Sequence, residues 1–102
     1  MITGKWQGEV NTPLGPQHWK FVLNEIEGKV EGRSTYVENE NETVDIRNGR
    51  NDGEKVVFEM THTSPFFGES DFKIKLTPDG DNYTGTLKMS YGRQPIILKR
   101  SE

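Results

Sequence analysis

The stretch Gly4-Lys5-Trp6-Gln7-Gly8-Glu9-Val10 alternates at every step between a small or apolar residue and a polar or charged one. Successive side chains of a β-strand point to opposite faces of the sheet, so a period of two predicts a strand with one buried face. The face that carries Trp6 and Val10 is predicted to lie against the core. The face that carries Lys5 and Glu9 is predicted to meet water.

The same period of two recurs along the rest of the chain, and no segment shows the period of about 3.6 residues that is typical of an amphipathic helix. The dipeptides Asn48-Gly49 and Asp52-Gly53 tolerate positive φ and indicate hairpin turns. The segment 11–17 contains two prolines and a glycine, and predicts a break because proline cannot donate a hydrogen bond within a central strand. We therefore expect about eight short strands, at residues 3–10, 18–26, 29–37, 43–48, 54–62, 71–77, 83–91 and 95–101.

Even spacing and hairpin-length turns favour an all-β fold, an antiparallel up-and-down β-barrel of about eight strands, in a single domain over residues 1–102. A sandwich of two sheets is the competing architecture, because its strands would show the same alternation. Small residues on an inner face allow strands to bend sharply, and three glycines fall on the predicted inner face: Gly8, Gly32 and Gly85.

The composition fits a thin core built from one apolar face per strand. Only 30% of the 102 residues are hydrophobic, yet 10% are aromatic, which is unusual for a disordered chain of this polarity. The absence of cysteine excludes disulfides, a thiol nucleophile and a cysteine zinc site. No apolar run approaches the roughly 18–20 residues of a membrane span, and no signal-peptide-like stretch follows Met1, so we expect a cytoplasmic protein without a membrane partner.

The charge pattern argues against a nucleic-acid partner. Thirteen Lys and Arg residues against sixteen Asp and Glu residues give a net charge of −3, and the two signs are interleaved along the sequence. A nucleic-acid binder usually carries a basic stripe instead. The acidic stretch 38–42 is interpreted as a solvated turn, with a cation site as the alternative.

Two features resemble the calycin-type barrels, which include the lipocalins, fatty-acid-binding proteins and avidins. Gly4-Lys5-Trp6 resembles their Gly-x-Trp motif, and Arg100 resembles the basic residue that packs across that tryptophan. The opening Gly4-Lys5-Trp6-Gln7-Gly8 is also similar to that of small lipocalin-like barrel domains of bacteria. The resemblance implies that Gly4, Trp6 and Arg100 close the barrel by joining its first and last strands. The second lipocalin motif and the terminal helix are missing from this sequence, and no ligand-contacting set carries over.

The barrel interior is the predicted binding site. A barrel of about eight strands either fills its lumen with side chains or holds one small ligand. We expect a small hydrophobic or aromatic molecule there, because the inner face is aromatic with a few polar groups. His62 is placed at the barrel mouth, either as a rim residue with satisfied hydrogen bonds or as a polar group that faces the ligand. Phe66 and Phe67 are interpreted as a lid, with a partner contact or a loop folded over the barrel end as the alternatives. The predicted ligand-binding residues are Tyr36, Phe58, Met60, His62, Phe66, Phe67, Tyr83, Met89 and Tyr91.

Two alternatives to ligand binding remain open. The lumen can be filled, in which case the domain is a structural or interaction module, either monomeric or a homodimer formed through outward-facing Val22, Val37, Val57 and Ile97. An enzyme that uses His62 or a tyrosine at the barrel mouth is the third hypothesis. The sequence contains no nucleophile elbow, zinc-binding helix motif or phosphate loop, so no catalytic residue, metal or cofactor is predicted.

Overall fold

The computed structural model describes residues 2–13, 15–39, 42–64, 68–90 and 92–101. The predicted site residues Phe66, Phe67 and Tyr91 lie outside the described residues. Over the described ranges the chain forms strands and one short 3-10 helix, η1. The elements are β1 (Gly4–Thr12), β2 (Gly15–Ile26), β3 (Lys29–Tyr36), η1 (Val37–Asn39), β4 (Thr43–Asp45), β5 (Arg47–Asn51), β6 (Val56–Ser64), β7 (Gly68–Asp79), β8 (Asn82–Met89) and β9 (Gly92–Arg100).

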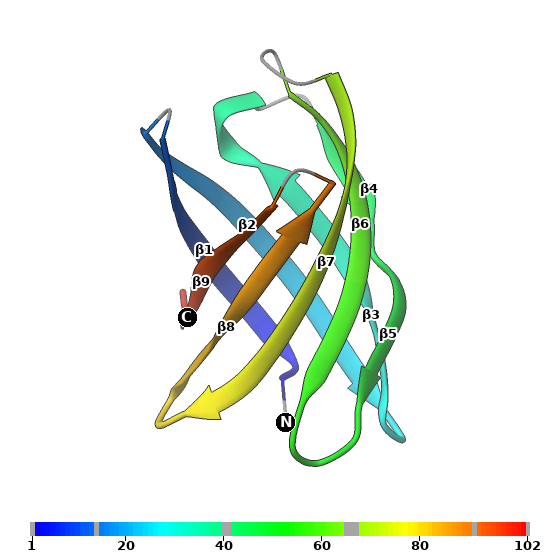
Figure 1. The fold of residues 1–102 in the computed structure, drawn as a ribbon. Coiled ribbons are helices and arrows are strands. Elements are labelled where there is room, and N and C mark those ends of the chain that lie inside the picture. The colour runs from blue at the N-terminus through cyan, green and yellow to red at the C-terminus, as the bar shows by residue number, and fades with distance from the viewer. Residues whose placement is uncertain (1, 14, 40–41, 65–67, 91, 102) are drawn as a thin grey trace.

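The strands form a closed antiparallel up-and-down barrel (Figure 1). Strands that follow one another in sequence pair, except that β5 pairs with β3 and β6 and not with β4, and the pairing of β9 with β1 closes the ring. The short strands β4 and β5 both pair with β3, so together they occupy one place in the ring, and the barrel has eight positions. The predicted fold is confirmed, and the two-sheet sandwich is not observed.

The first and last strands meet in the register Trp6↔Arg100. The Arg100 guanidinium lies 4.3 Å from the centroid of the Trp6 ring and donates a hydrogen bond to the Thr3 carbonyl at 3.0 Å. Gly4 has a φ of 142°, and a Cβ atom at this position would overlap the Arg100 guanidinium. Glycine suits this junction because residues with a side chain rarely adopt this φ, and an added Cβ would make the end of the Arg100 side chain shift.

The β1–β2 hairpin is longer than predicted. Its strands continue to Thr12 and resume at Gly15, so Pro16 lies within β2 opposite Asn11. The prediction of a break over 11–17 was therefore wrong over most of that segment. Pro16 is exposed and close to the hairpin end, where a missing N–H does not interrupt a buried ladder.

The predicted turn at Asn48-Gly49 is a bulge inside β5. Asn48 has a φ of 54°, and the pairing register of β5 with β6 shifts between Arg47 and Arg50. The chain turns instead after β5, where the Asp52 carboxylate accepts hydrogen bonds from the backbone N–H groups of the two residues before β6, at 2.9 and 2.8 Å. The residue type that suits positive φ was recognised from the sequence, but a strand bulge uses the same conformation as a turn.

Side chains fill the middle of the barrel. Phe21 from β2 and Phe58 from β6 meet edge to face across it, with ring centroids 5.5 Å apart. The alternation of the sequence produces this core directly, because each strand contributes every second residue. The largest fully buried side chains are Trp6, Phe21, Phe58, Ile2, Met60, Ile74, Leu76, Leu87, Ile96, Leu98, His62 and Val10.

No helix in the described residues is long and apolar enough to cross a membrane.

Candidate functional site

Four rings gather near the end of the barrel where β3 and β6 finish, and we call Trp19, Tyr36, His62 and Phe72 the aromatic end. Trp19 stacks on Tyr36 with centroids 5.2 Å apart and an angle of 23° between the rings. Phe72 meets Trp19 edge-on at 5.8 Å, and His62 lies 6.1 Å from Tyr36. All four residues are at most 6% exposed. The strands β2 and β3 thus face β6 and β7 through a continuous aromatic layer.

His62 is held at both ring nitrogens. Its Nε2 lies 2.9 Å from the Ser34 hydroxyl oxygen, and its Nδ1 lies 2.6 Å from Oε1 of Glu42. The same Glu42 oxygen accepts a hydrogen bond from the Thr63 backbone N–H at 2.6 Å. A histidine on the inner face of β6 is compatible with the core because its polar atoms are paired.

The surroundings of His62 and Glu42 determine which of the two side chains carries a proton. Burial lowers the pKa of His62, against the opposing effect of the Glu42 carboxylate. Burial acts to raise the pKa of Glu42, but hydrogen bonds from Thr63 and His62 together hold that pKa below its ordinary value. At neutral pH Glu42 is therefore ionised and His62 is neutral. His62 then donates from Nδ1 to Glu42, and Nε2 accepts the proton of the Ser34 hydroxyl.

The indole Nε1–H of Trp19 is a buried hydrogen-bond donor of the aromatic end that the described part of the chain leaves unsatisfied. Its ring is 3% exposed, and its Nε1–H has no hydrogen-bond acceptor among the described residues. An unpaired buried donor costs about 1–3 kcal/mol. By contrast, the Trp6 Nε1–H donates to the Ile2 carbonyl at 2.8 Å.

The structure gathers part of the predicted site. Tyr36 and His62 lie together, and Met60 is the cross-strand partner of Phe72. The Tyr36 hydroxyl donates to the Gln17 side-chain oxygen, so this polar group is already occupied.

The other described members of the predicted set lie elsewhere or at the margin. Phe58 lies deeper, against Phe21. Tyr83 packs edge-on against Trp6, with centroids 5.2 Å apart. Met89 is half-buried at the end of β8.

Four residues of the site are not in the predicted set: Trp19, Ser34, Glu42 and Phe72. The sequence analysis interprets Glu42 as part of a solvated acidic turn, but its side chain turns inward to His62 and is only 20% exposed. Trp19 is buried on the inner face of β2. Nothing in the local sequence indicates that Glu42 has a buried partner or that Trp19 lacks one.

Of the predicted outward apolar residues, Val37 and Ile97 line the same hollow of about 380 Å³, whereas Val22 does not line it. Val22, 54% exposed, lies between Lys5 and Arg33 on the neighbouring strands. Ile97, 45% exposed, has Glu9 as its partner on β1. The register therefore sets Val22 between two basic residues and Ile97 beside an acidic one.

The structure also has hollows of about 1090, 380 and 380 Å³, and none of these three is lined by His62 or Tyr36. Within the described part of the chain, no group of three or more His, Cys, Asp or Glu side chains could hold a metal ion. Comparison with known proteins found no matching family model, no matching curated protein and no matching solved structure.

Proposed function

We propose that the aromatic end binds a small apolar or aromatic molecule that carries a hydrogen-bond acceptor such as a carbonyl oxygen. The unpaired Trp19 Nε1–H is the observation that carries this proposal. A ligand oxygen at that atom would remove the cost of the buried donor. The stacked Trp19 and Tyr36 rings would then supply apolar contact area.

The remaining polar groups narrow the ligand chemistry. His62 is hydrogen-bonded to both Ser34 and Glu42, and the Tyr36 hydroxyl is hydrogen-bonded to Gln17. None of these groups needs a ligand to satisfy it. A neutral molecule with a single acceptor therefore suits the aromatic end better than a charged or strongly polar one.

We also propose that the chain is a calycin-type barrel related to the small lipocalin-like domains of bacteria. The stacking of Arg100 on Trp6 beside Gly4 supports this relationship, since it is the arrangement that the resemblance implies. Calycin-type barrels hold ligands inside the barrel, which agrees with a site among inward-facing residues.

Native mass spectrometry of freshly purified protein tests the binding function. We expect the wild type to carry a small molecule, and Trp19→Phe to carry much less of it because the donor is gone. Tyr83→Phe is the matched control, because its ring lies against Trp6, away from the aromatic end. A wild type that carries no molecule, and takes up none from a panel of neutral aromatic ketones, would contradict the proposal.

The hydrogen-bonded chain Ser34–His62–Glu42 favours a second candidate function, acyl transfer. Its connectivity is that of a serine nucleophile, a histidine base and an orienting carboxylate. Ser34 Oγ would attack an ester carbonyl and pass its proton through His62 to the leaving alcohol, and water would release the acyl group. Ser34 is fully buried, so a substrate has to enter past the aromatic rings.

A reactive organophosphonate tests this second function. Covalent labelling of the wild type, and none of Ser34→Ala, would support acyl transfer. An unlabelled wild type would exclude it and leave the binding function standing.

A further inference from the structure

Basic side chains line up across the outer face of β7, β8 and β9. Lys73 on β7 is the cross-strand partner of Lys88 on β8, and Lys88 is the partner of Arg93 on β9. Adjacent strands lie about 4.7–4.9 Å apart, so three like charges are set side by side. Lys75 lies two residues from Lys73 on the same outer face, and all four side chains are exposed.

Among the described residues, the nearby carboxylates form no ion pair with the row. Asp71 pairs with Arg47 at 3.5 Å. Glu59, the partner of Lys73 on β6, accepts a hydrogen bond from the Asn48 side chain at 3.2 Å. Across the described residues, no ion pair or hydrogen bond neutralises the row Lys73–Lys88–Arg93 or Lys75.

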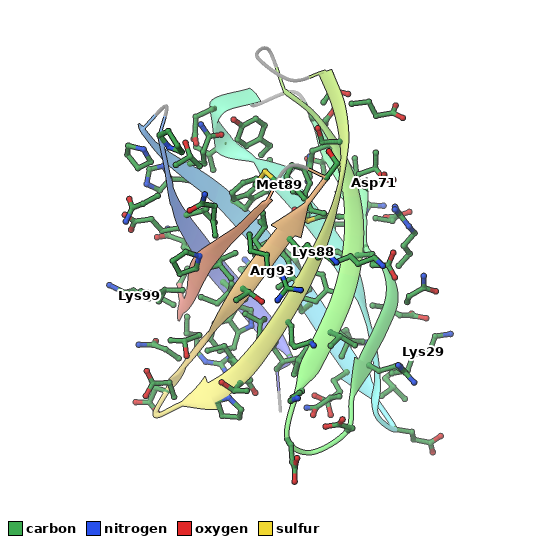
Figure 2. The ribbon with its side chains drawn as sticks, in the orientation of Figure 1. Lys29, Asp71, Lys88, Met89, Arg93 and Lys99 are labelled. Atoms are coloured by element: carbon green, nitrogen blue, oxygen red, sulfur yellow. The ribbon has the colours of Figure 1, made fainter. Side chains whose placement is uncertain are left out.

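This row borders the hollow of about 1090 Å³, in which basic side chains outnumber acidic ones by seven to three. The excess is opposite in sign to the net charge of −3 of the whole chain. Folding therefore sorts charges that are interleaved in the sequence, because alternate residues go to opposite faces and the register aligns the lysines. Figure 2 shows Lys88 and Arg93 close together over β8 and β9, whereas Lys99 projects away from them.

We propose that this hollow binds a compact anion that carries two or more phosphate groups, with Lys73, Lys88 and Arg93 as its principal contacts. Like charges directly opposite one another destabilise a sheet, and a ligand with closely spaced negative charges would neutralise several of them at once. The volume of about 1090 Å³ lies just above the range of about 300–1,000 Å³ that is common for small-ligand sites, so the hollow has room for such an anion. This site is on the outside of the barrel and does not depend on the proposed function of the aromatic end.

The surroundings favour phosphate groups over a nucleic acid or a protein partner. The described outward-facing residues of β6, β7 and β8 include no aromatic side chain on which a base could stack. Val57 is the one apolar residue among those outward-facing positions, and the exposed Pro95 and Ile97 of β9 do not line the hollow, so the hollow lacks the apolar centre of a protein interface. Recognition on this face therefore depends on charge.

Calorimetric titration with inorganic triphosphate at low salt tests the proposal. We expect saturable binding by the wild type, and binding at least fivefold weaker by Lys88→Gln, which removes the middle charge of the row. Lys99→Gln is the matched control, because it removes the same charge from an exposed site outside the hollow, and we expect less than a twofold change. Circular dichroism checks that both variants remain folded.

Two further titrations, with ATP and with a short single-stranded oligonucleotide, identify the kind of molecule that carries the phosphate groups. We expect ATP to bind as tightly as inorganic triphosphate, because the face offers nothing to the base. Equal weakening by Lys88→Gln and Lys99→Gln, or no binding by the wild type at millimolar triphosphate, would overturn the site. Preferential binding of a short single-stranded oligonucleotide would overturn the compact ligand in favour of a nucleic acid.

Discussion

The two tryptophans place their indole N–H groups in opposite situations. Trp6 donates to the Ile2 carbonyl, whereas Trp19 has no acceptor among the described residues. Both Trp→Phe changes shrink a buried ring, but only Trp6→Phe breaks a hydrogen bond and leaves a buried carbonyl without its donor. We expect Trp6→Phe to lower the free energy of unfolding by about 1–2 kcal/mol more than Trp19→Phe does. Urea denaturation measures both, and an equal or larger loss for Trp19→Phe would contradict this difference.

His62 makes stability depend on pH in a defined direction. Its pKa is lowered in the folded state, so below the ordinary value of 6.5 the unfolded chain binds a proton that the folded chain does not. The contribution of His62 to the free energy of unfolding is therefore complete above pH 6.5. It decreases as the pH drops below that value, by up to about 1.4 kcal/mol per pH unit. Glu42 adds a loss below its ordinary value of 4.5, because its folded pKa is also lowered.

Melting temperatures between pH 7 and pH 5 test this dependence. We expect His62→Gln to flatten the profile in that window. His18→Gln is the matched control for removing an imidazole, at an exposed side chain that lies 3.6 Å from the Glu38 carboxylate. An unchanged slope in His62→Gln would show that other groups cause the loss.

In the sheet formed by β7, β8 and β9, the like charges of the row Lys73–Lys88–Arg93 repel one another and lower the free energy of unfolding when no ligand is bound. Lys88→Glu would replace two repulsive cross-strand pairs by two attractive ones. We expect it to raise the free energy of unfolding by about 0.5–1 kcal/mol, and to weaken triphosphate binding more than Lys88→Gln does. Thermal unfolding at low and high salt checks the first effect, which should shrink as salt screens the charges. A loss of stability in Lys88→Glu at low salt would contradict the repulsion.

The strands themselves could be predicted from the sequence more fully than their connections. A period of two is local, so β1 and the inner-face positions of Tyr36 and His62 follow directly from it. The bulge in β5 does not, because Asn48-Gly49 suits a turn and a bulge equally well. The contact between Glu42 and His62 depends on how the connection after β3 folds back toward β6, which no local pattern specifies.

At the scale of the whole molecule, one junction closes the ring. Gly4→Ala should be destabilising because its Cβ would displace the Arg100 guanidinium from the Trp6 ring. In a double-mutant cycle with Arg100→Gln we expect a coupling of at least about 0.5 kcal/mol. Gly53→Ala is the control: its φ of 97° carries similar backbone strain, but no atom lies within 4 Å of the added Cβ, so its coupling to Arg100→Gln should be near zero. Additive effects of Gly4→Ala and Arg100→Gln would contradict the steric role of Gly4.

Closure of the barrel follows from the sequence only in part. Alternation is shared by barrels and sandwiches, and the choice between them is made by the long-range pairing of the first and last strands, in the register Trp6↔Arg100. The motif that carries the family resemblance lies at this pairing. The basic row on the outside is likewise a product of register, which is why interleaved charges in the sequence gave no indication of it.

The indole N–H resonances of the protein test the central claim, a ligand bound at Trp19, most directly. The chain has two tryptophans, so a ¹H–¹⁵N spectrum contains two such signals, and Trp19→Phe assigns them. On titration with small neutral aromatic ketones we expect the Trp19 signal to move downfield and saturate, as its proton gains an acceptor, while the Trp6 signal stays in place. A Trp19 signal that no ketone in the panel moves, or two signals that move together, would contradict binding at the aromatic end.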